Sequence, residues 1–256
     1  MNSSAVSPGR AGLLLLLTGQ MLPLIDTSIT NVALDSITHS LDASATQLEL
    51  IVALYGVAFA VCLAMGSKLG DNYGRRRLFL WGVAVFGIAS LLCGMANSIN
   101  ALLAARTLQG AGAALIVPQI LATLHVTLKG TAHARAISLY GGIGGIAFIV
   151  GQMGGGWLVS ADIAGLGWRN AFFINVPIGI VVTILTLQTL RNRETKTEIR
   201  PIDTVGLVLL VVGIGALQIM LDRGRELDWF SSTEIIVLTV VAVVALSVLF
   251  VWEMTD

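Results

Sequence analysis

The sequence predicts an all-α membrane protein with eight membrane-spanning helices. Of its 256 residues, 55% are apolar and 12% are charged, and the mean hydropathy is +0.86. Soluble domains carry about 25% charged residues, so a chain this apolar is expected to face lipid over most of its exterior. Eight apolar stretches also have the roughly 20 residues that a spanning helix needs.

The eight segments are separated by short polar connections, which leaves no room for a soluble domain. Lipid offers no partners for open backbone groups, so each segment is expected to be helical despite many glycines. We divide the chain into an N-terminal tail (1–10), a six-helix bundle (11–190), a linker (191–202) and two further helices (203–256). The segments are Ala11–Ser36, Gln47–Ser67, Leu78–Asn97, Ala101–Leu124, Ala136–Val159, Ala171–Leu190, Asp203–Leu221 and Glu234–Trp252.

The cations lie mostly on one side of the predicted membrane. Connections after the second, fourth and sixth segments, together with Arg10, hold 11 of the 15 Lys and Arg residues. The opposite connections hold only Arg169, Arg223 and Arg225. Because cytoplasmic loops are rich in Lys and Arg, both termini are predicted to be cytoplasmic, as expected for a multi-pass protein of the cytoplasmic membrane.

Several functional classes are disfavoured. A net charge of zero provides no basic field for nucleic acid. Cys62 and Cys93 lie in apolar stretches, so neither a disulfide nor a metal site is expected. The three histidines lie at helix ends or in loops with no converging nucleophile, and no phosphate-binding loop is present, so an enzyme is not expected. A channel is a weak alternative because no selectivity-filter sequence is visible.

Two charges break the apolar pattern, Asp26 in the first segment and Arg106 in the fourth. Charges inside spanning helices are costly and are usually functional. The helical rise of about 1.5 Å per residue puts them about 13 Å and about 9 Å below the same membrane boundary. We therefore predict that they face one cavity and interact, directly or through water. A purely structural pair that fixes helix register is the alternative.

Polar and irregular residues accompany these charges. Gln109 and Gly110 share a helix face with Arg106, and a glycine there allows close approach of another backbone or a substrate. Pro118 is expected to kink the inner half of its helix, and Pro23 to perturb the first helix just before Asp26. Bent helices beside a buried charge are a known way to build a site at the membrane midplane.

The fifth segment is dense in glycine. The pairs Gly141/Gly145 and Gly151/Gly155 form small-xxx-small faces that permit tight helix packing. A packing role and a hinge role are equally compatible with this pattern.

The connection after the second segment carries the most specific pattern. Its glycines suit a tight turn, and a carboxylate there can accept hydrogen bonds from Arg side chains or helix amides. An ordinary positive-inside loop explains the arginines but not the spacing of Gly66, Asp71 and Gly74. The stretch reads Gly66-Ser-Lys-Leu69-Gly-Asp71-Asn-Tyr-Gly74-Arg75-Arg76-Arg77.

This stretch resembles motif A of the major facilitator superfamily, and three further matches lie in the order and on the helices expected for that family. The region Ile25-Asp26-Thr27 to Asn31 resembles the first-helix motif of drug exporters, and Arg106-Thr-Leu-Gln109-Gly110-Ala-Gly112 resembles motif B. Gly167-Trp168-Arg169 to Asn175-Val-Pro177 resembles the sixth-helix entrance of fourteen-helix drug:proton antiporters of the EmrB/QacA type. The two helices after residue 203 also fit that fourteen-helix group.

The resemblance implies efflux of drug-like or amphipathic small molecules by alternating access, driven by a proton gradient without a bound cofactor. Asp26, Asn31, Arg106, Gln109 and Gly110 would form the proton-coupling and substrate cavity. The implied gating residues of motif A are Gly66, Asp71, Gly74, Arg75 and Arg76.

The fifth segment departs from the family's antiporter motif, which has a Gly-Pro pair before two spaced glycines. Here Gly151 is followed by Gln152, while Gly155 and Gly156 are retained. Transport is therefore better supported than antiport.

The chain also ends after eight helices, where the family has fourteen. We expect the C-terminal bundle to be a missing partner, so the chain is the N-terminal part of a proton-coupled exporter, one half of a split transporter, or a non-transporting fragment.

Overall fold

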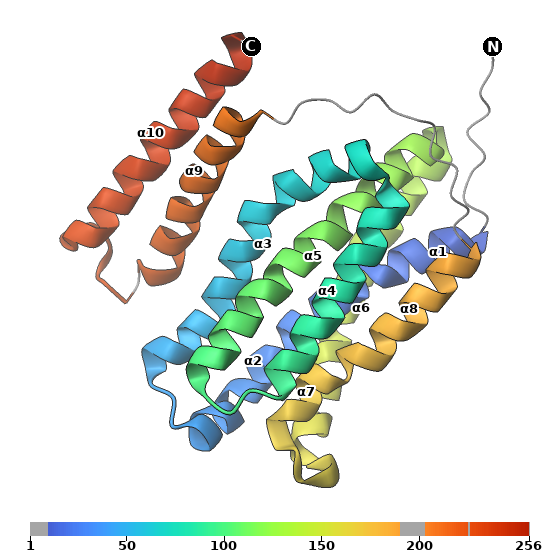
Figure 1. The fold of residues 1–256 in the computed structure, drawn as a ribbon, viewed down its shortest axis with the longest axis vertical. Helices are drawn as coiled ribbons and strands as arrows, with labels where there is room; N and C mark the ends of the chain where they lie inside the picture. Colours follow the sequence, from blue (N-terminus) through green and yellow to red (C-terminus); the bar gives the residue numbers. More distant parts are fainter. Residues whose placement is uncertain (1–9, 190–202, 225, 256) are drawn as a thin grey trace.

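The computed structural model describes residues 10–189, 203–224 and 226–255, and it is helical throughout its long elements. Figure 1 shows an antiparallel bundle of α-helices with a separate helical pair along one side. The bundle consists of α1 (Arg10–Gly19), α2 (Met21–Leu41), α3 (Ala45–Tyr73), α4 (Arg75–Gly94), α5 (Ile99–Thr127), α6 (Gly130–Ser160), α7 (Asn170–Phe173) and α8 (Asn175–Thr189), with 3₁₀ turns η1 (Ile163–Gly165) and η2 (Gly167–Arg169) before α7.

The separate pair is α9 (Thr204–Arg223) and α10 (Thr233–Thr255), joined through the 3₁₀ turn η3 (Trp229–Ser231). It packs on the bundle through α9 and α3. Gly56 of α3 lies against the side chain of Gln218, and Gly215 of α9 lies against Val61. Arg223 forms a 2.6 Å ion pair with Glu234, which ties the two helices together near their connection. In the structure α9 and α10 therefore form a pair beside the bundle, while the division of the chain into domains stays a prediction.

Within the described residues, seven helices are long and apolar enough to span a membrane. The remaining predicted segment, Ala11–Ser36, is divided between α1 and α2 by a break at Gln20. Pro23 lies in the first turn of α2, where its missing N–H is not needed, so the irregularity expected beside Asp26 begins before the proline. The predicted tail 1–10, except Arg10, and the predicted linker 191–202 lie outside the described residues.

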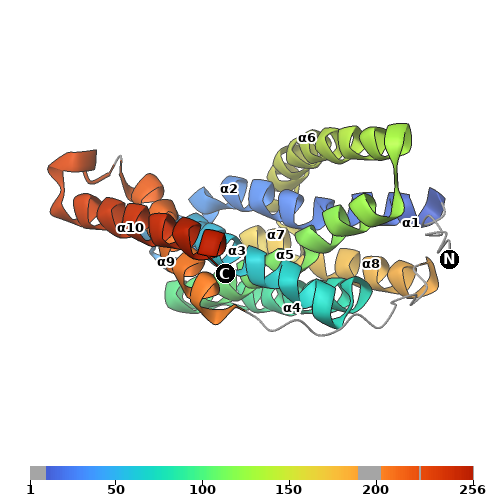
Figure 2. The ribbon, with the colours of Figure 1, turned by 90° about the horizontal axis from the view of Figure 1, so that it is seen from above.

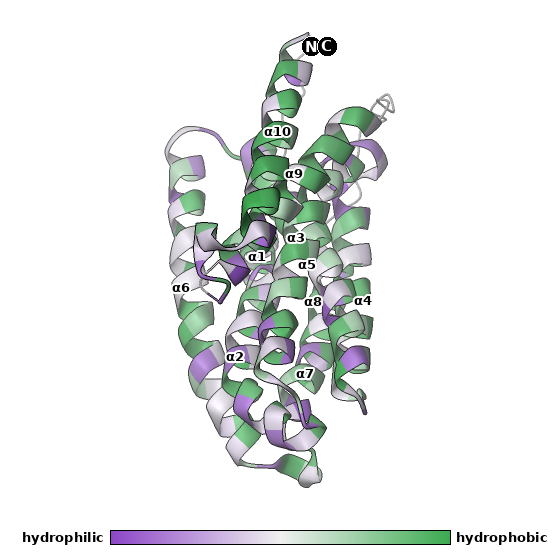
Figure 3. Cartoon of the chain, turned by 90° about the vertical axis from the view of Figure 1, so that its left-hand side faces the viewer, coloured by the Kyte–Doolittle hydropathy of each residue, from purple (hydrophilic) through white to green (hydrophobic). Residues whose placement is uncertain are grey.

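The connections alternate between the two ends of the molecule. In Figure 1 the α3–α4 and α5–α6 connections lie at the upper end, and the α2–α3, α4–α5 and α9–α10 connections lie at the lower end. Figure 3 shows apolar residues along the middle of the helices, most densely on α10. This arrangement fits helices that cross lipid and meet water at their ends.

Two helices of the bundle begin with serine caps. The Ser44 hydroxyl accepts the N–H of Gln47 at 3.3 Å, while the Gln47 side chain accepts the N–H of Ser44, which completes a capping box. The Ser98 hydroxyl accepts the N–H of Ala101 and caps α5. These caps satisfy amides that would otherwise lack partners at the helix starts.

Glycines let α5 pack closely between α3 and α4. A side chain at Gly110 would collide with the Tyr55 carbonyl of α3, and one at Gly66 would collide with the Ala114 carbonyl of α5. A side chain at Gly112 would come within 2.8 Å of the Phe86 backbone nitrogen on α4. The expected close approach at Gly110 is therefore an approach of another backbone. Although Pro118 removes one backbone donor, α5 continues through it without a break.

The two glycine pairs of α6 have different surroundings. Figure 2 shows α6 beside α1 and α2 and away from α4 and α8. Gly151 and Gly155 press against Ser28 and Ile29 of α2, whereas nothing lies within 4 Å of a side chain placed at Gly141 or Gly145. The pair Gly151/Gly155 therefore has a packing role, whereas the pair Gly141/Gly145 leaves its face of α6 open.

This difference makes a matched comparison possible. Gly155→Ala is expected to destabilise the protein by about 1–3 kcal/mol, because the added methyl collides with Ile29. Gly145→Ala is expected to be neutral or slightly stabilising, because alanine is the better helix former by about 1 kcal/mol and meets no neighbour. The unfolding temperature of each variant in detergent measures the change in stability. Equal effects at the two positions would contradict the assignment.

The start of α9 is tied to α10 by a carboxylate. Asp203 accepts the N–H of Gly206 at 2.9 Å through one oxygen and the indole N–H of Trp252 at 3.0 Å through the other. The Gly206 N–H favours the charged form and lowers the pKa of Asp203 below its usual 3.8.

A lowered pKa in the folded state means that Asp203 stabilises the fold above about pH 4, and that this contribution is lost as the pH falls through the folded value. Asp203→Ala is therefore expected to lower the unfolding midpoint at pH 7, with a smaller difference from the wild type at pH 3. Asp35→Ala, at an exposed position on α2, is the control. An Asp203→Ala deficit that is the same at both pH values would contradict this prediction.

Candidate functional site

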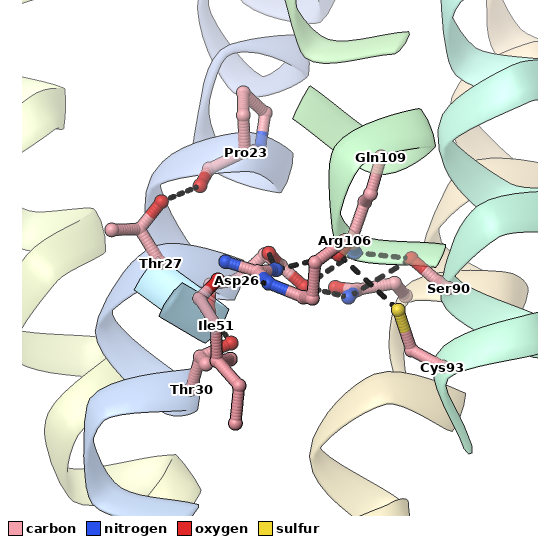
Figure 4. Close-up of polar contacts among 10 residues, drawn as sticks. Pro23, Asp26, Thr27, Thr30, Ile51, Ser90, Cys93, Arg106 and Gln109 are labelled. Atoms are coloured by element: carbon pink, nitrogen blue, oxygen red, sulfur yellow. Dashed lines mark hydrogen bonds and ion pairs between the residues drawn. The ribbon is translucent and has the colours of Figure 1, made fainter. Parts of the chain in front are cut away.

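A buried polar network joins five helices in the middle of the bundle. It is centred on Asp26 of α2 and Arg106 of α5, whose side chains are 0% and 1% exposed. Figure 4 shows these two side chains pointing toward each other, with Ser90 of α4 and Gln109 of α5 beside them. Asn175, the first residue of α8, reaches the same carboxylate, and Ile51 of α3 contributes its backbone.

Three donors hold the Asp26 carboxylate. Arg106 Nη1 lies 2.6 Å from one oxygen, while the side-chain amides of Gln109 and Asn175 lie 2.7 Å and 2.6 Å from the other. All three groups donate hydrogen bonds to the carboxylate, which is the pattern that an ionised aspartate accepts. The site therefore contains one buried negative charge neutralised by one buried positive charge.

Arg106 is fixed on several sides. Its Nε donates to the carbonyl of Ile51 at 3.2 Å, and its Nη1 also donates to the Gln109 side-chain oxygen at 2.5 Å. The guanidinium lies 4.3 Å from the ring centroid of Tyr55 and 5.8 Å from that of Phe172. Cation–π contacts of this kind are strongest where water is excluded. The close approach of α3 to α5 at Gly110 brings both Tyr55 and Ile51 within reach.

The network extends from Gln109 toward α4. The Gln109 amide nitrogen donates to the Ser90 hydroxyl at 2.7 Å, and its oxygen accepts from the Cys93 thiol at 3.7 Å. Asn175 also donates to Ser90, at 3.3 Å. Gln109 thus links the ion pair to α4, and Ser90 links α4 to α8.

The predicted contact between Asp26 and Arg106 is confirmed as a direct ion pair. The expectation that the two charges line a cavity is wrong for this structure, because both side chains are enclosed by the bundle. Gln109 joins them as expected, and Gly110 lies next to them against α3. Asn31 does not join the network, because five residues of helix rotate it away from Asp26 to an exposed position on α2.

Sequence reasoning did not place Ser90, Tyr55 or Asn175 in the site. Asn175 offered a usable signal, because it is an amide within an otherwise apolar segment. Ser90 and Tyr55 offered none, since a serine or a tyrosine is common in spanning helices and only the packing of α3 and α4 on α5 brings these two to the ion pair.

The second candidate cluster, motif A, lies at the α3–α4 end of the bundle. Its residues are helical rather than a loop, with Gly66 to Tyr73 in the last turns of α3 and the three arginines in the first turn of α4. Gly74 alone separates the two helices, with a φ of 99° that favours glycine. Arg75 forms a 2.7 Å ion pair with Asp71 and donates to the Ala122 carbonyl of α5 at 2.9 Å. Arg76 donates to the Leu187 carbonyl of α8 at 3.3 Å.

Motif A therefore connects the ends of four helices, α3, α4, α5 and α8. A further contact comes from Gln119 of α5, which donates to the Gly66 carbonyl at 2.7 Å. Of the antiporter-like residues on α6, Gly151 and Gly155 contact α2, Gln152 is half-buried, and Gly156 lies near Val32. Within the described residues, no three His, Cys, Asp or Glu side chains converge as a metal site would require.

The ion pair is expected to show strong energetic coupling. Arg106→Gln leaves Asp26 charged and unpaired, which should destabilise the fold by about 3–5 kcal/mol. Adding Asp26→Asn removes the remaining charge and should recover part of that loss, so the double variant should be more stable than Arg106→Gln alone. The free energy of unfolding in mixed micelles is measured for both single variants and for the double variant. Strictly additive losses would contradict the coupling.

Known proteins similar in sequence to this chain align with nearly its whole length. The chain is 46% identical over 235 residues to the multidrug export protein EmrB of Escherichia coli K12, covering 92% of this chain and 45% of that protein. It is 41% identical to EmrB of Haemophilus influenzae, covering 97% and 49%. The fatty acid resistance protein FarB of Neisseria gonorrhoeae is 40% identical, covering 92% and 46%. The chain spans about half the length of these relatives.

Solved structures share the fold at low identity. A bacterial homolog of the human lysosomal transporter Spinster, inward-facing and unoccupied, matches with a TM-score of 0.66 at 19% identity, covering 91% of this chain and 58% of that one. The proton:xylose symporter XylE matches with a TM-score of 0.56 at 16% identity, covering 84% and 53%. The sequence profile of the Major Facilitator Superfamily matches residues 16–255. The chain is a membrane protein that belongs to the major facilitator superfamily and is not an enzyme.

Proposed function

We propose that this chain supplies the N-terminal half of a proton-coupled exporter of amphipathic small molecules that works by alternating access. The observation that carries the proposal is the enclosed Asp26–Arg106 pair with its amide partners. Similarity to the multidrug export protein EmrB supports the substrate class. Since the chain spans about half of those relatives, we propose that a C-terminal bundle completes the transporter.

The chemistry of the pair supports proton coupling. A proton that reaches Asp26 neutralises the carboxylate and removes the electrostatic hold on Arg106. Arg106 would then keep a full charge in a low-dielectric interior, which is costly unless it moves toward water or a new partner. The helices that carry its partners would rearrange in response, and this is how a local protonation becomes a change between two global states.

Motif A is the proposed brace of the inward end. Asp71, Arg75 and Arg76 tie α3 and α4 to the carbonyls of α5 and α8 at one end of the bundle. With the cation-rich connections in the cytoplasm, this end would face inward in the cytoplasmic membrane. Breaking and remaking these contacts would accompany opening toward the cytoplasm.

The coupling is tested by dye efflux in cells that lack their own exporters and express this chain together with a C-terminal half. Asp26→Asn is expected to abolish efflux driven by a pH gradient, because an amide cannot exchange the proton. Asp35→Asn, an exposed carboxylate on the same helix, should retain wild-type efflux. Efflux that persists unchanged after the gradient is collapsed would overturn proton coupling.

The same assay tests the alternatives of a fragment and a split half. This chain expressed alone is expected to export no dye, because a substrate cavity between two bundles would have only one wall. Export restored by co-expression of the C-terminal half supports the split arrangement. Export by this chain alone would show that the second bundle is not required.

A further inference from the structure

An open groove is lined by residues of α4, of α5 and of the connection between them, at the end of the bundle opposite motif A. It has a volume of about 620 Å³, within the range of roughly 300–1,000 Å³ typical of small-molecule sites. Alanines at positions 101, 104 and 105 of α5 form its floor, and Leu92, Met95 and Leu108 border it. The small alanine side chains leave the space that defines the groove.

The length of the groove corresponds to one leaflet of a bilayer. Its residues extend along α5 from Ser98, the cap of that helix, to Leu108. The helical rise of about 1.5 Å per residue separates these two positions by about 15 Å, which is half of the roughly 30 Å hydrocarbon core. A spanning helix of a partner protein would extend through both leaflets, whereas a lipid chain ends at the midplane.

A cation lies beside the groove, at its water-facing end. Arg169 donates to the carbonyl of Ala96, one of the lining residues, at 3.0 Å, and its guanidinium lies 4.5 Å from the Trp168 ring centroid. Among the described residues, none of the ion pairs involves Arg169. Asp162, in the same connection, accepts the N–H of Gly167. The unpaired charge and the start of α5 both favour an anion at this level.

We infer that this groove binds a glycerophospholipid, with its phosphate at Arg169 and one acyl chain lying along the alanine floor. The two parts of the site match the two parts of the ligand, since the charge lies at the water-facing end and the apolar groove extends toward the membrane centre. A lipid with net negative charge binds more tightly than a zwitterionic one, because the water-facing end of the site carries a positive charge. The binding does not depend on transport activity.

The test is native mass spectrometry of the delipidated full chain titrated with phosphatidylglycerol or phosphatidylethanolamine of matched acyl chains. The wild type should bind one molecule of phosphatidylglycerol in preference to phosphatidylethanolamine. Arg169→Gln should weaken phosphatidylglycerol binding by about tenfold, the usual size of a lost charge-assisted hydrogen bond. Arg169→Lys, which retains the charge, should recover part of the preference.

The groove itself is tested by filling it. Ala101→Leu with Ala104→Leu should reduce binding of both lipids, because the added side chains occupy the acyl-chain space. Ala84→Leu, at an exposed position of α4 outside the groove, is the matched control and should bind like the wild type. Circular dichroism confirms that each variant remains helical.

Three results would overturn the proposal. Wild-type affinity in the filled variant would show that lipid does not occupy the groove. Soluble glycerol 1-phosphate that competes as well as the whole lipid would show an anion site without a chain site. A cationic amphipathic dye that binds the groove more tightly than phosphatidylglycerol would identify it as an entry port for substrate.

Discussion

The enclosed ion pair between Asp26 and Arg106 is the constraint on which the bundle depends. Lipid cannot solvate either charge, so each must be neutralised from within the protein. The pair therefore fixes the rotation of α2 and α5, and the amides of Gln109 and Asn175 fix the helices around it. Glycines at the crossings of α5 allow the backbones to come close enough for this contact. Packing and electrostatics thus specify the same arrangement.

The same constraint underlies the proposed proton coupling. A neutral pair in a closed interior is stable, but only while both charges are present. Removing one charge leaves the other buried without a neutralising partner, which costs several kcal/mol. Arg106 contacts groups on α2, α3 and α5, and Phe172 of α7, so in the proposed mechanism one protonation would affect several helices together.

Much of the fold could be predicted from composition and apolar segments, because lipid permits few structures. The ion pair was also predictable, since two opposite charges at similar depth have few other partners. The enclosure of that pair was not predictable, because it depends on how α3, α4 and α8 pack around it. Ser90 shows the limit most clearly, since only the pairing of α4 with α5 makes it part of the network. The break at Gln20 also carried no local signal beyond the nearby proline.

The contacts of α6 divide the bundle into two groups of helices. Its close glycine contacts, Gly151 and Gly155, reach α2, and the side chains of Gln20 and Ser28 donate to its carbonyls at Tyr140 and Phe148. Helices α3, α4 and α5 are joined mainly to one another. The polar network is therefore a joint between two bodies, one carrying the carboxylate and the other the guanidinium. A force that slides the bodies past each other would act on that joint, so its strength contributes to the resistance of the bundle to shear.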